Sequence, residues 1–268
     1  MNKRCALELL MLLIFLTPVA VSAEEATHTV LRSTFKLFNK DSTATCFLLH
    51  DPSKPKKLLL ATSGHVLEKA GGEEAVLVLR EAQDDGTFRR NDVPIRIREG
   101  GKNLWTKHEK EDVAVLPLKL PETVKVDSLP ITSLATEDDI RDEKLDVCSP
   151  VWVFGFPARL ESNGAGFPIA RNATIASYPL IPVKHHRTYM IDCSTFAGDS
   201  GGPVFVTRKA GTNKGAPLVI GMVVAQYRND EKIVSTHEER LIRHRLSLGK
   251  IVQAAFIRQA FATASGGS

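Results

Sequence analysis

The chain has 268 residues, of which 43% are hydrophobic and 25% charged, with a formal net charge of +4. These values are close to the averages of globular proteins, so the composition excludes a disordered chain and allows one large domain or two small ones. Lysine and arginine are spread along the chain without a long basic block, which argues against a nucleic-acid-binding protein.

Residues 1–23 have the three parts of a secretory signal peptide. A positively charged start precedes an almost wholly apolar run at residues 9–16, and Val-Ser-Ala at 21–23 offers small residues for cleavage. The apolar run is shorter than the roughly 20 residues of a transmembrane helix. We therefore expect a secreted or periplasmic protein whose mature chain begins near Glu24, without stable membrane insertion. A retained membrane anchor is the alternative interpretation.

Short apolar or β-branched runs, separated by turn-forming clusters, dominate the middle of the chain. This spacing predicts an all-β sandwich or barrel. A polar, acidic stretch at residues 136–146 interrupts the pattern and is the best boundary between two similar β halves. We therefore predict a first β unit at residues 24–135 and a second at residues 136–246.

The C-terminal segment, residues 247–268, has helical rather than strand periodicity. Apolar residues recur at steps of three and four from Leu248 onward, which predicts an amphipathic helix from about Ser247 to Ala262. Its polar face lacks the lysine- and arginine-rich character of an interfacial helix, so we expect it to pack on the preceding β unit. A loose tail is predicted after it, from Ala264.

The strongest chemical signal is Phe-Ala-Gly-Asp-Ser-Gly-Gly-Pro at residues 196–203. A serine hydroxyl is a poor nucleophile unless a neighbouring base activates it, and the tetrahedral intermediate that it forms carries an oxyanion. Gly198, two places before Ser200, can turn its backbone N–H toward that oxyanion, because glycine tolerates conformations that other residues avoid. The alternative is a glycine-rich hairpin turn with an incidental serine.

Two further motifs supply a base and a residue to orient it. His65 follows an apolar strand at residues 58–61, and histidine is the usual general base near neutral pH. Asp112 stands directly before the apolar run 113–116, where its carboxylate can accept the second ring N–H of a histidine and hold the tautomer. Each motif is common by itself. In the order His65, Asp112 and Ser200 they predict a catalytic triad in a cleft between the two β halves.

Four motifs of this chain resemble those of the trypsin-like (chymotrypsin-fold) serine peptidases. Ala-Thr-Ser-Gly-His-Val at 61–66 and Asp-Val-Ala-Val-Leu at 112–116 are similar to the family's histidine and aspartate motifs. Gly-Asp-Ser-Gly-Gly-Pro at 198–203 is identical to its nucleophile motif, and Phe-Gly-Phe-Pro at 154–157 resembles a turn of its bacterial members. The resemblance spans roughly residues 30–230.

The resemblance implies two antiparallel six-stranded β-barrels with the active site between them. It implies a serine endopeptidase that hydrolyses peptide bonds through an acyl-enzyme on Ser200, with His65 as general base and acid and Asp112 orienting it. The backbone N–H groups of Gly198 and Ser200 would form the oxyanion hole. A protein or peptide substrate is expected, and no cofactor, metal or nucleic acid.

One departure from the family concerns activation. Vertebrate members mature by cleavage before an Ile-Val-Gly-Gly N-terminus, whose amine pairs with the aspartate that precedes the serine, and this chain has no such sequence. Asp199 therefore needs another partner or a different loop arrangement. The alternative function is a latent or inactive protease-fold protein that acts by binding.

A second departure concerns specificity. Ser194, six residues before the serine, occupies the position that the family places at the bottom of the primary specificity pocket, so cleavage after lysine or arginine is not supported. The resemblance places Val224, Ala225 and Gln226 in the pocket wall. Gln226 stands where the family often has glycine, which favours small or medium apolar substrate residues.

The cysteines depart from the secreted vertebrate members as well. No cysteine follows His65 or Ser200 directly, which is typical of a bacterial or otherwise disulfide-poor branch. Cys46, Cys148 and Cys193 remain after signal cleavage, and their pairing cannot be read from the sequence. We interpret them as three small buried residues, because none stands in a zinc or redox motif.

Other interpretations have weaker support. Gly-Asp-Ser-Gly-Gly also fits the nucleophile elbow of α/β-hydrolases, with Asp230 and His237 in the required order, but the alternating strands and helices of that fold are missing. A metal site at His185 and His186 is disfavoured because adjacent strand residues point in opposite directions. Asn172 begins a glycosylation sequon that matters only in a eukaryotic secretory pathway. The oligomeric state stays open.

Overall fold

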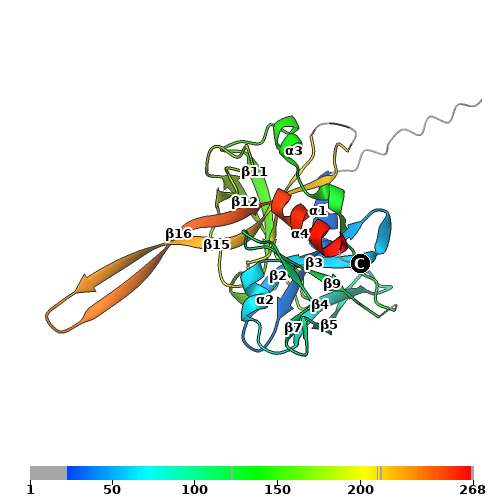
Figure 1. The fold of residues 1–268 in the computed structure, drawn as a ribbon, viewed down its shortest axis with the longest axis horizontal. Coiled ribbons are helices and arrows are strands. Elements are labelled where there is room, and N and C mark those ends of the chain that lie inside the picture. The colour runs from blue at the N-terminus through cyan, green and yellow to red at the C-terminus, as the bar shows by residue number, and fades with distance from the viewer. Residues whose placement is uncertain (1–22, 122, 210, 212, 267–268) are drawn as a thin grey trace, which may run out of the picture.

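A computed structural model describes residues 23–121, 123–209, 211 and 213–266. The predicted signal peptide therefore lies almost entirely outside the described residues. Within them the chain is mainly β, with a large open sheet and a closed barrel that pack against each other (Figure 1). None of the described helices has the length and apolar character needed to cross a membrane.

The first β unit is an open eight-stranded sheet in the order β5-β4-β1-β2-β3-β9-β8, with β10 paired to β2. Its strands are β1 (Thr34–Phe38), β2 (Thr43–Asp51), β3 (Lys54–Thr62), β4 (Glu74–Ala82), β5 (Phe88–Arg96), β8 (Thr106–Lys107), β9 (Ala114–Leu118) and β10 (Leu129–Pro130). A separate two-stranded ribbon joins β6 (Arg98–Glu99) to β7 (Lys102–Asn103).

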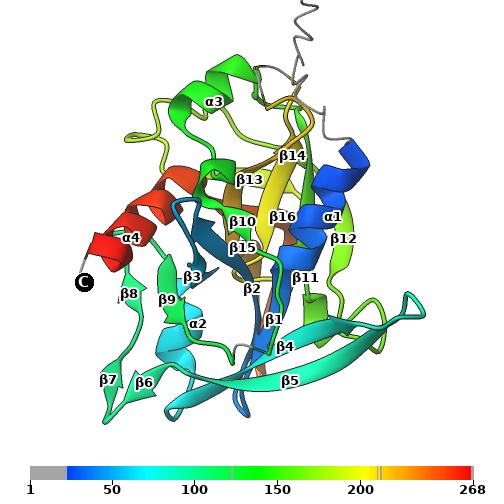
Figure 2. The same cartoon turned by 90° about the vertical axis from the view of Figure 1, so that its right-hand side faces the viewer.

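The predicted closure of this first unit into a six-stranded barrel is not shown. β4 and β5 form a long hairpin along the lower edge of the molecule in Figure 2. β5 carries charged and amide side chains at residues 89–92 and is largely exposed, so it lies at the edge of the sheet rather than closing onto β8.

The second β unit is a closed six-stranded barrel, which confirms one of the two barrels that the resemblance implies. Its order is β11-β12-β13-β16-β15-β14. The strands are β11 (Pro150–Gly155), β12 (Ile169–Ile175), β13 (Thr188–Asp192), β14 (Pro203–Thr207), β15 (Pro217–Val234) and β16 (Glu239–Gln253).

Helical segments lie between and beside the sheets. They are α1 (Ala23–Ser33), α2 (Gly64–Lys69), η1 (Ile131–Ser133), α3 (Glu137–Asp142), η2 (Pro157–Arg159) and α4 (Ala254–Gly266). α3 falls in the acidic stretch predicted as the boundary, and a capping box starts it: Thr136 accepts the Asp139 N–H while the Asp139 carboxylate accepts the Thr136 N–H.

The predicted start of the C-terminal helix was wrong. Residues 247–253 belong to β16, and α4 begins only at Ala254 and continues to Gly266, within the segment predicted as a tail. Leu248, Ile251 and Val252 satisfy a helical spacing, but pairing of β16 with both β13 and β15 closes the barrel and outweighs that local pattern.

Two hydrophobic cores explain why three strands of the first sheet, β2, β3 and β9, have continuous apolar runs. On β2, Phe47 and Leu49 pack in a core shared with the barrel, α1 and α4, whereas Cys46 and Leu48 face a second core inside the first sheet. Successive residues of a strand point to opposite faces, so β2 is buried on both sides. β3 and β9 do the same, which sets their ends at the junction of the two units.

The three cysteines of the described chain are free thiols. Cys46 and Cys193 are buried, as expected, but Cys148 is exposed. Cys148 lies in the turn before β11 with a φ of +68°, and this turn at the barrel surface leaves its side chain outside the core.

Candidate active site

The register of β3 and β9 brings His65 and Asp112 together. Thr62, at the end of β3, pairs with Ala114, at the start of β9. His65 lies in the first turn of α2, just after β3, and Asp112 lies in the turn just before β9. The two residues thus sit side by side although 47 positions separate them.

Asp112 holds His65 through both carboxylate oxygens. Its Oδ2 lies 2.6 Å from His65 Nδ1, and its Oδ1 accepts the His65 backbone N–H at 2.8 Å. The first contact directs the proton of the neutral ring to Nδ1, which leaves Nε2 as the basic nitrogen. The second fixes the carboxylate relative to the backbone of α2. This is the arrangement that a histidine general base requires.

The Asp112 carboxylate stays ionised in this position. Burial opposes its ionisation, but hydrogen bonds and charge from His65, with a contribution from Lys107, outweigh burial and hold the pKa of Asp112 below its ordinary value. Gly64 makes the close approach possible, because a Cβ there would lie 3.1 Å from both Asp112 Oδ1 and the Lys107 side chain.

The Ser200 loop lies against the segment that precedes His65. The Val223 carbonyl on β15 accepts the Gly201 N–H at 2.8 Å and the Ser63 hydroxyl at 3.0 Å. Ser200 itself is half-buried, and its carbonyl accepts the Thr45 N–H of β2 at 2.9 Å. The barrel thus supplies the serine while the first sheet supplies the His–Asp pair.

No hydrogen bond joins Ser200 Oγ to the His65 ring within the described part of the chain. Hydrogen bonds between nucleophile and base are often long in the absence of substrate, so the lack of a Ser200–His65 hydrogen bond is compatible with a nucleophilic serine.

Gly198 has a φ of +105°, a conformation that favours glycine. A Cβ at this position would overlap the Phe156 carbonyl. The Gly198 carbonyl accepts the Thr45 hydroxyl at 2.7 Å, which orients this peptide. Among the described residues the N–H groups of Gly198 and Ser200 have no acceptor, so both are available to an external oxygen.

Asp199 has the counter-ion that sequence reasoning required but did not identify. The Arg171 guanidinium, from β12, binds both carboxylate oxygens, at 2.6 Å to Oδ1 and 3.0 Å to Oδ2, and Oδ2 also accepts the Phe196 N–H at 2.8 Å. The Asp199 side chain is only 1% exposed. This fork-to-fork pair holds the serine loop without an N-terminal amine.

Gly155 leaves the space that the Asp199–Arg171 ion pair occupies, since a Cβ at Gly155 would overlap Asp199 Oδ1. Burial raises the pKa of Asp199, and the charge and hydrogen bonds of Arg171 oppose that rise. Arg171 also donates to the Ser194 carbonyl at 2.7 Å, so one side chain ties two points of the loop. No local pattern distinguishes Arg171 from the other 34 lysines and arginines, and only the lack of a partner for Asp199 hinted that such a cation exists.

The predicted pocket residues lie on two facing segments. Ser194 is exposed on one, and Val224 is buried while Ala225 is exposed on the other, β15. With its amide oriented to suit its neighbours, Gln226 donates to the Thr195 carbonyl at 2.7 Å and accepts from Arg228 at 2.7 Å. Gln226 therefore bridges the two segments, as a residue that narrows the space between them would.

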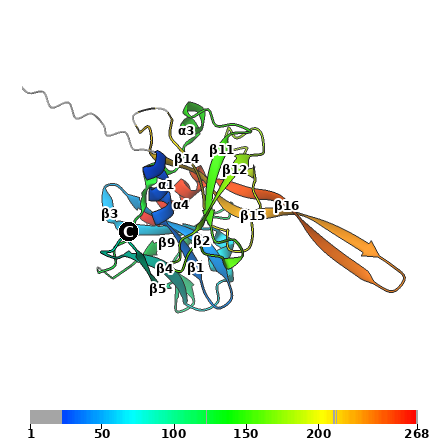
Figure 3. The same ribbon diagram turned by 180° about the vertical axis from the view of Figure 1, so that it is seen from behind.

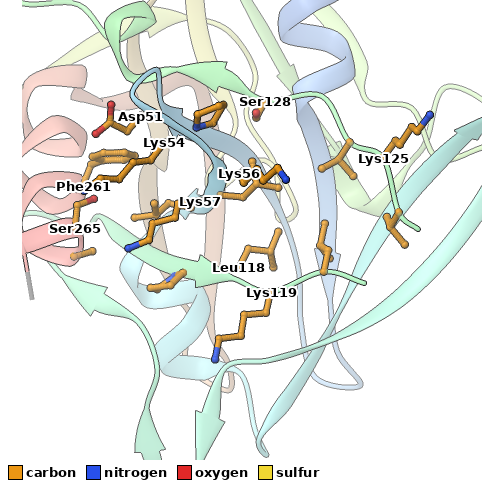
Figure 4. Close-up of a pocket in the computed structure, with 18 of the residues that line it drawn as sticks. Asp51, Lys54, Lys56, Lys57, Leu118, Lys119, Lys125, Ser128, Phe261 and Ser265 are labelled. Carbon is orange, nitrogen blue, oxygen red and sulfur yellow. The ribbon is translucent and has the colours of Figure 1, made fainter. Parts of the chain in front are cut away.

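Two cavities of the described chain lie away from the triad residues. One of about 900 Å³ sits beside the start of β3 and the end of α4, lined by lysines that include Lys54, Lys56 and Lys119 (Figure 4). Another of about 650 Å³ lies beside α4. Neither is lined by His65 or Ser200. No group of three metal-ligating side chains occurs among the described residues.

A closed β-barrel and an open β-sheet, with a His–Asp pair and a serine loop where they meet, define the chymotrypsin-like class of serine protease folds. Solved structures of that class resemble this chain. The thermostable serine protease AL20 from an extremophilic microorganism has a TM-score of 0.51 and 14% identity, and the alignment covers 90% of this chain and 100% of AL20. The protease Anisep from Arthrobacter nicotinovorans has a TM-score of 0.53 and 16% identity, with 88% and 97% covered.

A sequence model of the trypsin-like peptidase domain family matches residues 44–211, and the chain belongs to this family. The match includes His65, Asp112 and Ser200. No curated protein matches the chain.

Proposed function

We propose that this protein is a serine endopeptidase that forms an acyl-enzyme on Ser200. The observation that carries the proposal is the double contact of Asp112 with His65, beside the Ser200 loop, in a member of the trypsin-like peptidase family. In the proposed reaction His65 Nε2 removes the Ser200 hydroxyl proton as Oγ attacks the substrate carbonyl. His65 then returns the proton to the leaving amine, and water, deprotonated by His65, releases the acyl group.

The developing oxyanion would be bound by the N–H groups of Gly198 and Ser200. The ion pair of Arg171 with Asp199 supports an assembled loop, because it takes the place of the activation amine whose absence favoured a latent protein. Signal removal would then be the only processing that the enzyme needs.

The test of activity is labelling by a fluorophosphonate, which reacts only with an activated serine, measured by intact mass on the protein from Glu24 onward. One added phosphonyl group per chain is expected for the wild type and none for Ser200→Ala. A folded wild type that stays unlabelled would contradict the proposal and favour a binding role.

The proposed specificity is for small or medium apolar residues on the acyl side of the cleaved bond. Two observations support this: the Gln226 amide donates to the Thr195 carbonyl at the predicted pocket, and Ser194 supplies no carboxylate for a basic substrate residue. Cleavage sites mapped by mass spectrometry in an unfolded protein should carry alanine, valine or leucine there. Arginine or lysine at these sites would refute this assignment.

Export is proposed from the sequence alone. Expression of the full chain in a bacterial host, followed by N-terminal sequencing of the exported protein, should find a mature terminus near Glu24. An intact N-terminus in the cell membrane fraction would instead indicate a retained anchor.

A further inference from the structure

The outer parts of β15 and β16, residues 227–246, form a two-stranded arm that projects away from the rest of the molecule (Figures 1 and 3). Its strands pair with each other from Arg228 and Arg245 to Val234 and Glu239. Every residue of the arm except Ile242 is exposed. A lone two-stranded hairpin is marginally stable in water, and unpaired strand edges are usually protected, so an exposed arm of this length indicates a binding element.

One edge of the arm begins at the serine loop. β14 pairs with β15 up to Met222, and the last backbone bonds along this edge join Val223 to Gly201 and Gly202. Beyond Val223 no strand in the described chain pairs with this edge of β15, which runs unpaired to Val234. The open edge next to Ser200 therefore leads into the arm, through two irregularities of β15, one between Val223 and Ala225 and one between Gln226 and Arg228.

The base of the arm is anchored to the predicted pocket. The Arg245 guanidinium lies 4.6 Å from the ring centre of Phe196, and the Ser247 and Ser194 hydroxyls are 2.9 Å apart. On β15 itself, Arg228 donates to the Gln226 amide oxygen, and the Gln226 amide nitrogen donates to the Thr195 carbonyl of the neighbouring segment. These contacts fix the direction of the arm relative to the serine loop, so a chain bound along it would be held at a set distance from Ser200.

The charges of the arm largely satisfy one another. Lys232 pairs with Glu239 at 2.8 Å and His244 with Glu231 at 2.8 Å, and Arg240 pairs with Glu238 at 2.9 Å. The arm therefore does not favour a strongly acidic or basic partner. What it offers is backbone hydrogen bonding and apolar contact near its tip, where Ile233, Val234 and Leu241 are 45%, 66% and 52% exposed.

We propose that the arm extends the substrate-binding edge, so that one flank of an unfolded polypeptide substrate adds to β15 as a further strand. At roughly 3.3 Å per residue, Ile233 lies about 30 Å along the strand from Val224. Apolar substrate residues about ten positions from the cleaved bond would therefore contact the tip. Only an unfolded segment has backbone groups free for this pairing, so the substrate class is extended or denatured protein.

This inference rests on the proposed endopeptidase function, and its test separates the two. The first variant replaces residues 229–244 by Asn-Gly, which closes the paired Arg228 and Arg245 with a two-residue turn. The second, Ile233→Ser with Leu241→Ser, keeps the arm but removes apolar surface. His237→Ser, in the turn at the tip, is the matched control.

The measurement compares kcat/KM on a four-residue peptide with that on unfolded peptides that extend about twelve residues to either side of the cleaved bond. Several backbone hydrogen bonds, each contributing modestly, predict at least about a tenfold advantage for one of the long peptides in the wild type. The shortened variant should lose this advantage while fluorophosphonate labels it at the wild-type rate. The double serine variant should lose part of it, and His237→Ser none.

The same long peptide should bind Ser200→Ala with the intact arm at least about tenfold more tightly than Ser200→Ala with the shortened arm, measured by fluorescence anisotropy. N-methylation of alternate peptide amides should abolish that difference. If fluorophosphonate labels the wild type, but the wild type and the shortened variant prefer the long peptide equally, the inference is overturned and the proposed function stays intact. The inference would also be overturned if the wild type were a dimer, the shortened variant a monomer, and peptide binding the same in both. A second copy of the chain would then be what pairs with the arm.

Discussion

Replacing Arg171 by methionine isolates the ion pair that orders the serine loop. Methionine keeps an unbranched apolar stem but leaves the Asp199 carboxylate, 1% exposed, with only the Phe196 N–H as a hydrogen-bond partner. Removing one member of a buried pair leaves an uncompensated charge, so we expect a loss of about 3–5 kcal/mol in the free energy of unfolding near neutral pH.

The loss should depend on pH, and the sign follows from Asp199. Its folded-state pKa is already raised by burial, and removal of Arg171 takes away what opposes that rise. A carboxyl whose folded-state pKa exceeds its unfolded value of about 3.9 is fully stabilising below that value, and its contribution is lost as pH rises through the folded-state pKa. The variant should therefore weaken from pH 5 to pH 8 relative to wild type, by at most about 1.4 kcal/mol per pH unit.

Urea unfolding at pH 5 and pH 8, together with the rate of fluorophosphonate labelling, measures both effects. Arg171→Met with Asp199→Asn is the matched control, because asparagine can still accept the Phe196 N–H but carries no charge, and it should recover most of the stability and remove the pH dependence. Equal urea midpoints for Arg171→Met and the wild type at pH 8 would refute the reasoning. So would a variant that is equally weakened at both pH values.

Three other perturbations give distinct outcomes. Gly198→Ala introduces a Cβ that overlaps the Phe156 carbonyl, at a residue whose φ is positive. The rate of fluorophosphonate labelling should fall by about 100-fold or more, because the N–H group proposed to bind the oxyanion is displaced. An unchanged rate would exclude Gly198 from the oxyanion hole. Arg80→Met removes a buried guanidinium, of pKa about 10, that donates to four backbone carbonyls, and urea unfolding should show a loss of about 3 kcal/mol; an unchanged midpoint would count against it. Because the folded-state pKa of Asp112 is lowered, its carboxylate stabilises the fold fully above the unfolded pKa of about 3.9, and this contribution disappears as pH falls through the folded-state pKa. Asp112→Asn should therefore lack this part of the acid destabilisation of the wild type, measured by acid titration followed by fluorescence.

The chemistry of the candidate site was predictable from the sequence because each part depends on local residues. The serine motif can be recognised from its own loop, whereas His65 follows one apolar run and Asp112 directly precedes another. Alternation and turn clusters likewise identified the β class, since period-two patterning reflects burial of strands against a core. The six strands of the closed barrel were expected only from the family resemblance.

Tertiary pairing decided what local patterns could not. Residues 247–253 have a helical spacing, yet hydrogen bonds to β13 and β15 make them a strand, and the first sheet stays open because the polar strand β5 lies at its edge. Arg171 was unpredictable for the same reason: its identity as the partner of Asp199 comes from the register of β12 beside the serine loop, 28 residues further along the chain. The projecting arm also depends on register, because only the structure shows where β14 stops pairing with β15 and leaves its edge open.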